Sequence, residues 1–184
     1  SGEFAATMVI RVPVRPGVES PLPLFDGMDH INVASPSNAA DAVTLIDAAL
    51  DATGVTVLLE PITVLAETGG SAGPNDLGKA TVALSGDHVT IAAWGEGVAA
   101  AHAAARTLAT EGIEAEVIDI RSLHPLDVDT IGQSVHKTGR LVLVNGSAEM
   151  LQGAAERSFL RLESPPTLSQ THQIISKARA AVHY

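Results

Sequence analysis

The sequence predicts an α/β fold in which layers of helix cover short aliphatic strands. Apolar residues make up 46% of the 184 residues and charged residues 17%, the balance of a globular rather than a disordered chain. Aromatic residues are only 3%, so the core must be built from Val, Ile, Leu and Ala. These residues occur in short runs that alternate with alanine-rich stretches of helical periodicity, which is typical of a layered α/β fold.

Charge and composition exclude several classes of function. The formal net charge is −10, and no basic cluster is present that would bind a phosphate backbone or an anionic lipid surface. No apolar run approaches the roughly 20 residues that span a bilayer, and no secretion signal opens the chain. Cysteine is absent, which excludes disulfides and thiolate ligands. We therefore expect a cytoplasmic protein without a nucleic-acid or membrane partner.

In the first half of the chain, residues 8–66 are predicted to form one domain segment that ends at a linker. Residues 1–7, which open with Ser-Gly-Glu-Phe, are set apart as left from cloning or disordered. Strands are predicted at Met8–Val14, Ile31–Ser37 and Val55–Glu60, separated by a proline-rich loop and by a helix. Ser37 is the predicted N-cap of that helix. Its predicted inner face consists of Ala39, Val43, Ile46 and Leu50.

A linker is predicted at residues 67–76, because this stretch is rich in Gly, Pro and small polar residues and has no periodicity. Residues 77–184 then predict a second domain with a regular alternation of strands and helices. One helix follows Gly97 with an inner stripe of Val98, Ala101, Ala105 and Leu108. Another runs from the N-cap Asp127 to Gly139. Beyond it we predict a strand, a helix from Ser147, a loop and a terminal helix from Thr171.

A glycine-rich corner raises one specific hypothesis. Gly95, Gly97 and Ala100 follow an apolar strand and open a helix in the pattern G-x-G-x-x-A, the form of a dinucleotide-binding loop. Asp119 lies near the end of the next strand, where an acid would bind the ribose. Glu96 counts against this interpretation, because it places a negative charge inside the loop that would hold a diphosphate. A Rossmann-like NAD or FAD module thus stays an alternative to a structural turn.

Other chemistry-bearing residues predict no catalytic or metal site. The seven histidines lack the spacing of metal ligands. Glu60 ends an apolar strand before a proline, a position that favours a structural role over that of a general base. Ser147 is not in a G-x-S-x-G elbow, so a hydrolase triad has no support.

Several segments in order are more specific than any single motif. "VASPSNAADAVTLIDAAL", "VTVLLEP", "LGKATVALSGDHVTIAAWGEGV", "AEVIDIRSLHPLDVDTI" and "VHKTGRLVLV" follow one another along the chain. Together they resemble the beta subunit of the thiamine-diphosphate-dependent decarboxylase of 2-oxo-acid dehydrogenases, of pyruvate or branched-chain type. The resemblance covers roughly Met8 to Val144 and extends more loosely to the transketolase C-terminal-domain superfamily.

This resemblance implies a three-layer α/β/α transketolase C-terminal-like domain with a mixed sheet. A partial pyrimidine-binding domain would precede it. It implies that the corner at Gly95 is architectural. It also implies thiamine diphosphate and magnesium in the full assembly, and as partners an alpha subunit, a second beta copy and an acyltransferase core.

The departures from the family concern the catalytic groups. The family's cofactor-activating glutamate lies in a part with no counterpart here, and neither Glu60 nor His30 matches a catalytic position. Gly54 stands where some members have a potassium-binding Asn. We therefore expect a scaffold and interface portion that is inactive alone and that binds no cofactor by itself. A noncatalytic assembly protein is a further alternative.

Overall fold

The backbone of the computed structural model, which describes residues 6–16, 21–25, 28, 30–144 and 171–183, divides into two compact units. The first unit holds residues 1–79 and 121–126, and the second holds residues 80–120 and 127–184. The chain therefore leaves the first unit after Lys79, returns to it at Arg121 and leaves it again after Leu126. Each unit is built around its own four-stranded sheet.

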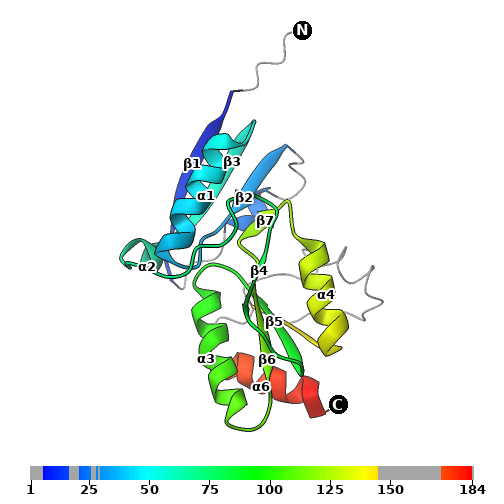
Figure 1. Ribbon diagram of the computed structural model, residues 1–184. Helices are drawn as coiled ribbons and strands as arrows, with labels where there is room; N and C mark the ends of the chain where they lie inside the picture. Colours follow the sequence, from blue (N-terminus) through cyan, green and yellow to red (C-terminus); the bar gives the residue numbers. More distant parts are fainter. Residues whose placement is uncertain (1–5, 17–20, 26–27, 29, 145–170, 184) are drawn as a thin grey trace. The chain divides into compact units, whose positions relative to one another are not determined.

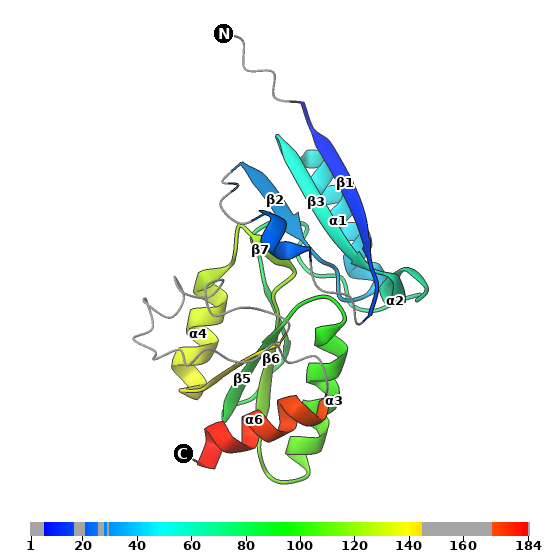
Figure 2. The same cartoon turned by 180° about the vertical axis from the view of Figure 1, so that it is seen from behind.

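The sheet of the first unit has the strand order β1-β3-β2-β7 (Figure 1). Strands β1, β3 and β2 are parallel, and β7 is antiparallel to β2. Helix α1 connects β2 to β3 and packs over β1 and β3, which Figures 1 and 2 show from opposite sides. The elements are β1 (Met8–Val14), η1 (Leu22–Phe25), β2 (Ile31–Ala34), α1 (Ala39–Asp51), β3 (Val55–Pro61), α2 (Ile62–Leu65) and β7 (Ser122–His124).

The strands predicted at residues 8–14 and 55–60 are confirmed. Of the predicted inner face of α1, Ile46 packs partly buried against the core, but Val43 and Leu50 were placed wrongly. Val43 and Leu50 are each 59% exposed, and the helix buries Leu45 together with Ala42, Ala48 and Ala49. Leu45 and Ala49 pack with Ala34 and Leu58 of the sheet. The helix uses this narrower stripe because alanine allows its backbone to approach the sheet closely.

The N-terminus of α1 also differs from the prediction. Asn38, and not Ser37, is the N-cap, and its side-chain oxygen accepts a hydrogen bond from the Asp41 backbone N–H at 3.0 Å. Both residue types cap helices well, so the sequence alone could not separate two adjacent candidates. The cap places Asp41 in the first turn of the helix, where the functional contacts described below begin.

The second unit is a three-layer α/β/α structure with a mixed sheet of order β4-β6-β5-β8. Strand β4 is antiparallel to β6, and the other pairs are parallel. Helices α3 and α6 pack together on one face, and α4 covers the other (Figures 1 and 2). The elements are β4 (Thr81–Leu84), β5 (Val89–Ala93), α3 (Gly97–Ala109), β6 (Ala115–Asp119), α4 (Val128–Thr138), β8 (Leu141–Leu143) and α6 (Thr171–His183).

The two faces of β5 explain how the layers are attached. Val89, Ile91 and Ala93 face the apolar cluster under α3 and α6. On the other side, the Thr90 hydroxyl hydrogen-bonds those of Ser134 and Thr138 on α4 at 2.7 and 2.8 Å. A buried polar group is tolerated when it is satisfied in this way. The sheet is therefore joined to α3 and α6 by apolar packing and to α4 partly by hydroxyl groups.

Most predictions for the second unit are confirmed. The four residues of the predicted α3 stripe are all buried. Asp127 caps α4 through a hydrogen bond from the Thr130 N–H at 3.1 Å, and Gly139 ends that helix with a φ of 70°. The terminal helix is α6. The helix predicted from Ser147 and the loop after it lie outside the described residues. In the part of the chain that the structure describes, no helix has both the length and the apolar character needed to cross a bilayer.

Candidate functional site

The glycine corner of the alternative NAD or FAD hypothesis lies between β5 and α3. The Gly97 N–H donates to the Trp94 carbonyl at 3.1 Å, and the Val98 N–H donates to the Gly95 carbonyl at 3.2 Å. These hydrogen bonds use amides that a dinucleotide loop would direct at a pyrophosphate. Asp119 is buried on β6, level with Ala93. The corner is therefore built as a closed turn, and a nucleotide at Gly95, Gly97 and Asp119 stays a prediction.

Glu60 lies at the carboxyl end of β3 and is only 3% exposed. Both of its carboxylate oxygens accept a hydrogen bond from Arg11 Nε, each at 3.0 Å. A general base needs a lone pair directed at a substrate proton. Glu60 instead forms a structural ion pair between β3 and the neighbouring strand β1.

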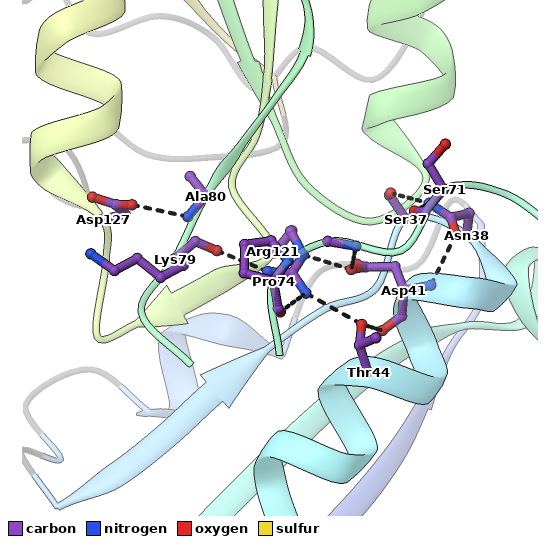
Figure 3. Close-up of polar contacts among 11 residues, drawn as sticks. Ser37, Asn38, Asp41, Thr44, Ser71, Pro74, Lys79, Ala80, Arg121 and Asp127 are labelled. Atoms are coloured by element: carbon purple, nitrogen blue, oxygen red, sulfur yellow. Dashed lines mark hydrogen bonds and ion pairs between the residues drawn. The ribbon is translucent and has the colours of Figure 1, made fainter. Parts of the chain in front are cut away.

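The densest polar centre of the first unit surrounds Arg121, which is 1% exposed and has a φ of 55° (Figure 3). Its Nε donates to Asp41 Oδ1 at 2.6 Å, and both residues of this ion pair are buried. Nη1 donates to the Lys79 carbonyl at 3.1 Å, and Nη2 donates to the Pro74 carbonyl at 2.8 Å. The planar guanidinium thus links the start of α1 to Pro74, in the segment predicted as a linker, and to Lys79, which follows that segment.

The negative charge of the buried Asp41 carboxylate is neutralised by Arg121. Oδ1 accepts from Arg121 and, at 3.4 Å, from the Gly73 N–H. Within the described ranges, Oδ2 is buried without a hydrogen-bond partner. A buried carboxylate with one unsatisfied oxygen is costly unless a cation neutralises it. Arg121 supplies that cation.

The segment of residues 69–79, which we call the strap, lies directly on the N-terminus of α1. The Gly69 carbonyl accepts from the Ala40 N–H at 3.1 Å. The Ser71 carbonyl accepts from Asn38 Nδ2 at 3.1 Å (Figure 3). A Cβ at Gly70 would collide with the Asn38 side chain, and one at Gly73 would collide with the Arg121 guanidinium. The glycines that suggested a flexible linker therefore permit close packing.

This polar centre lies at the N-terminus of α1 and beside the carboxyl end of β2, where the Ser35 N–H donates to the Arg121 carbonyl at 2.8 Å. In α/β folds ligands often bind at such strand ends. Here the chain's own strap satisfies the groups. Sequence reasoning missed Arg121 because a lone arginine in "IDIRSLHPLD" gives no sign of burial. The sequence marks Arg121 only by its position in a segment that carries the family resemblance.

Titratable groups elsewhere form no metal site in the described residues, where no group of three His, Cys, Asp or Glu side chains could hold an ion. His30 is exposed, and the carboxylate of Glu60 is held by Arg11. Burial, with a smaller effect of Arg106, lowers the pKa of His102 on α3. This half-buried histidine is therefore held toward its neutral form.

Glu116 is a buried carboxylate of the second unit with a cationic partner. Glu116 on β6 accepts hydrogen bonds from Lys137 of α4 and, at 3.4 Å, from the Gly86 N–H. Burial raises the pKa of Glu116, but hydrogen bonds from Lys137, Ser134 and Gly86 outweigh it, so that the pKa lies below its ordinary value of 4.5. The same hydrogen bond from Glu116 raises the pKa of Lys137.

The second unit is expected to lose stability in acid through Glu116. Because its folded pKa is lowered, its contribution is complete above the ordinary value of 4.5 and disappears as the pH falls through the folded pKa. Urea unfolding followed by Trp94 fluorescence, from neutral pH down to about 3, measures this slope. Glu116→Gln should flatten it, whereas Asp87→Asn, which alters the exposed acid near Lys137, should not. An unchanged slope in Glu116→Gln would contradict the assignment.

Comparison with known proteins agrees with this architecture. The family model of the transketolase C-terminal domain matches residues 78–174, more than half of the chain. The chain is 31% identical to the pyruvate dehydrogenase E1 component subunit beta of Acholeplasma laidlawii, over 100% of this chain and 62% of that subunit. It is 32% identical to the same subunit of Staphylococcus epidermidis, over 89% of this chain and 56% of that subunit. The chain thus spans about three fifths of the length of these relatives.

Solved structures show the same fold. A split-gene transketolase, described as an inactive beta4 tetramer, matches 95% of this chain and 66% of its own, with a TM-score of 0.74 and 23% identity. A transketolase from Pichia stipitis matches 88% of this chain and 26% of its own, with a TM-score of 0.60 and 15% identity. These structures, at 23% identity or less, show the fold alone. The family match over residues 78–174 shows that the chain belongs to the transketolase C-terminal domain family.

Proposed function

We propose that this chain is a beta-subunit-like portion of the decarboxylase component of a 2-oxo-acid dehydrogenase, and that it acts as scaffold and interface. The observation that carries this proposal is the alignment with pyruvate dehydrogenase beta subunits, which runs through both units at 31–32% identity. The more distant transketolases support the fold alone. The proposal assigns the acid–base chemistry to parts of the assembly outside the described residues.

The polar groups of the first unit support a scaffolding role, because they bind one another. Arg121, Asp41 and the strap satisfy one another at the start of α1, and Glu60 is held by Arg11. These groups position backbone segments, and none of them presents a free carboxylate or imidazole to a substrate. The chain's contribution to a reaction would then be to hold elements in place.

Thiamine diphosphate with magnesium is the cofactor that the family resemblance implies for the complete enzyme. The described residues do not fit it as a complete site, because Glu60 is engaged by Arg11 and no acidic cluster could hold the metal ion. We therefore derive no catalytic step from this chain. In the assembly that we propose, an alpha subunit, a second beta copy and an acyltransferase core accompany it, and the overall reaction transfers an acyl group to lipoamide.

The test combines binding with turnover. The purified chain is mixed with the alpha subunit of the Acholeplasma laidlawii pyruvate dehydrogenase, and the mixture is analysed by size-exclusion chromatography with light scattering. We expect a complex that elutes earlier than either protein, and no release of carbon dioxide from pyruvate by the chain alone. An unrelated acidic protein of similar size serves as the control partner. Unshifted elution with the alpha subunit, or turnover by the chain alone, would contradict the proposal.

Calorimetric titration separates this proposal from the nucleotide hypothesis. The chain alone is titrated with thiamine diphosphate plus magnesium, and separately with NADH. We expect no heat of binding in either titration. Saturable NADH binding that is lost in Gly97→Leu would favour the glycine corner as a nucleotide site and would contradict the scaffold assignment.

A further inference from the structure

The strap differs from the sheet of the first unit in how little of it is buried. Residues 67–80 form no helix or strand. No strap residue is fully buried, and only Gly73, Leu77 and Gly78 are half-buried. A segment with few buried apolar contacts opens at a lower free energy than the core beside it. We therefore expect the strap to open before the sheet does.

The contacts that close the strap come mainly from its backbone. Carbonyls along the strap accept hydrogen bonds from Asn38, Ala40 and Arg121, namely those of Gly69, Ser71, Pro74 and Lys79. The Gly73 N–H donates to Asp41 Oδ1 at 3.4 Å. Leu77 adds an apolar contact, because it packs against the cluster that contains Leu45. Arg121 holds two of these carbonyls and is therefore the main closing group.

Glycines with left-handed backbone angles lie near both ends of the strap. Gly69 has a φ of 88°, and Gly78 has a φ of 82°. A Cβ at Gly69 would meet nothing within 4 Å, so the backbone angle rather than close packing favours glycine there. Moving segments turn about a few residues that absorb large changes of φ and ψ. The strap has a residue suited to this role near each end.

We propose that the strap is a latch that opens and closes as one unit over the N-terminus of α1, while α1 and the sheet stay folded. In the closed state Arg121 holds the Pro74 carbonyl through Nη2 and the Lys79 carbonyl through Nη1 (Figure 3). Opening breaks the hydrogen bonds of the strap together and uncovers the first-turn amide of Ala40. Asp41 keeps its ion pair with Arg121 in both states, because that pair does not involve the strap.

The latch controls access to the N-terminus of α1 beside the carboxyl end of β2. In the closed state, strap carbonyls occupy the Ala40 amide and the Nη donors of Arg121. Another molecule reaches these donors only after the strap opens. This device goes beyond the proposed function, which rests on the comparisons and would stand if the strap stayed closed.

Residue-resolved hydrogen exchange of the full wild-type chain tests the latch. The reporters are the amides of Gly73 in the strap and of Ala40 in α1, and the reference is the set of amides in β3, the strand that pairs with both β1 and β2. We expect the two reporters to share one protection factor, at least about tenfold below that of β3. Protection equal to that of β3, or reporters that differ from each other by more than about tenfold, would overturn the proposal.

Arg121→Lys tests the closing group. Lysine keeps a cation for Asp41, but its single ammonium does not reproduce the planar fork that holds two carbonyls. We expect the protection of Gly73 and Ala40 to fall about tenfold and that of β3 to fall much less. Ser71→Ala is the matched control and should change neither, because the exposed Ser71 binds Asn38 through its carbonyl. Equal losses in the strap and in β3 would show that the strap opens only with the whole unit.

Limited digestion with trypsin gives an independent readout. Cleavage after Lys79 requires access to its carbonyl, which Arg121 binds at 3.1 Å in the closed strap. The rate of cleavage therefore follows the population of the open state, and we expect it to be about tenfold higher in Arg121→Lys than in the wild-type chain. Ser71→Ala should be cut at the wild-type rate. Cleavage after Lys79 that is no faster in Arg121→Lys would contradict the latch.

Discussion

Replacing Arg121 with methionine is expected to lower the free energy of unfolding of the first unit by about 3–5 kcal/mol. The substitution removes the cation from Asp41, whose carboxylate is buried and whose Oδ2 lacks a hydrogen-bond partner among the described atoms. It also leaves the Pro74 and Lys79 carbonyls without their guanidinium donor. Hydrogen–deuterium exchange of peptides from α1 and the strap measures the loss unit by unit.

Two further variants make this prediction specific. Arg179→Met removes a more exposed ion pair with Glu111, which water and salt screen, and should cost clearly less stability than Arg121→Met. The double variant Asp41→Leu with Arg121→Met removes both buried charges and should regain part of the stability lost in the single variant. A loss in Arg121→Met no greater than that in Arg179→Met would show that the buried pair does not hold the strap.

Leu45→Ala should destabilise the first unit by about 2–5 kcal/mol, because it leaves a cavity between α1 and the sheet. Leu45 is fully buried and packs with Ala34, Ala49 and Leu58. The matched variant Val43→Ala lies on the same helix but is 59% exposed, and it should change stability by no more than about 0.5 kcal/mol. Urea unfolding of both variants measures the difference.

This pair of variants also decides between two assignments of the helix face. The sequence pattern placed Val43 inside, whereas the structure places Leu45 there. A greater loss in Val43→Ala than in Leu45→Ala would restore the face that the sequence predicted and would contradict the described packing.

Sequence patterns predicted the second unit better than the first for a physical reason. In α3 the apolar residues larger than alanine, Val98 and Leu108, share one helical phase with Ala101, which predicts that this face is buried. In α1, apolar residues occupy two phases, and alanine appears in both. Only the sheet that receives the helix decides which phase is buried. The same ambiguity affected the choice between Ser37 and Asn38 as N-cap.

The polar centre could not be predicted because its contacts are distant in sequence. Arg121 and Asp41 lie 80 positions apart. The strap is a glycine-rich stretch whose composition is also that of a flexible linker. What distinguishes the two is the fit of Gly70 against Asn38 and of Gly73 against Arg121. The amino-acid composition shows that glycines are present, but it does not show which side chains pack against them.

The crossing of the chain between the two units has a consequence for its synthesis on the ribosome. Residues 1–79 contain the sheet strands β1, β2 and β3, but Arg121 and β7 are translated only after β4, α3 and β6. Until then α1 carries Asp41 without its cation. The first unit to begin emerging cannot complete its fold until much of the second has been made. The first unit therefore needs residues 121–126, which lie after most of the second unit in the sequence. Cutting the chain within the strap would yield an N-terminal piece without Arg121, the cation that Asp41 of α1 requires.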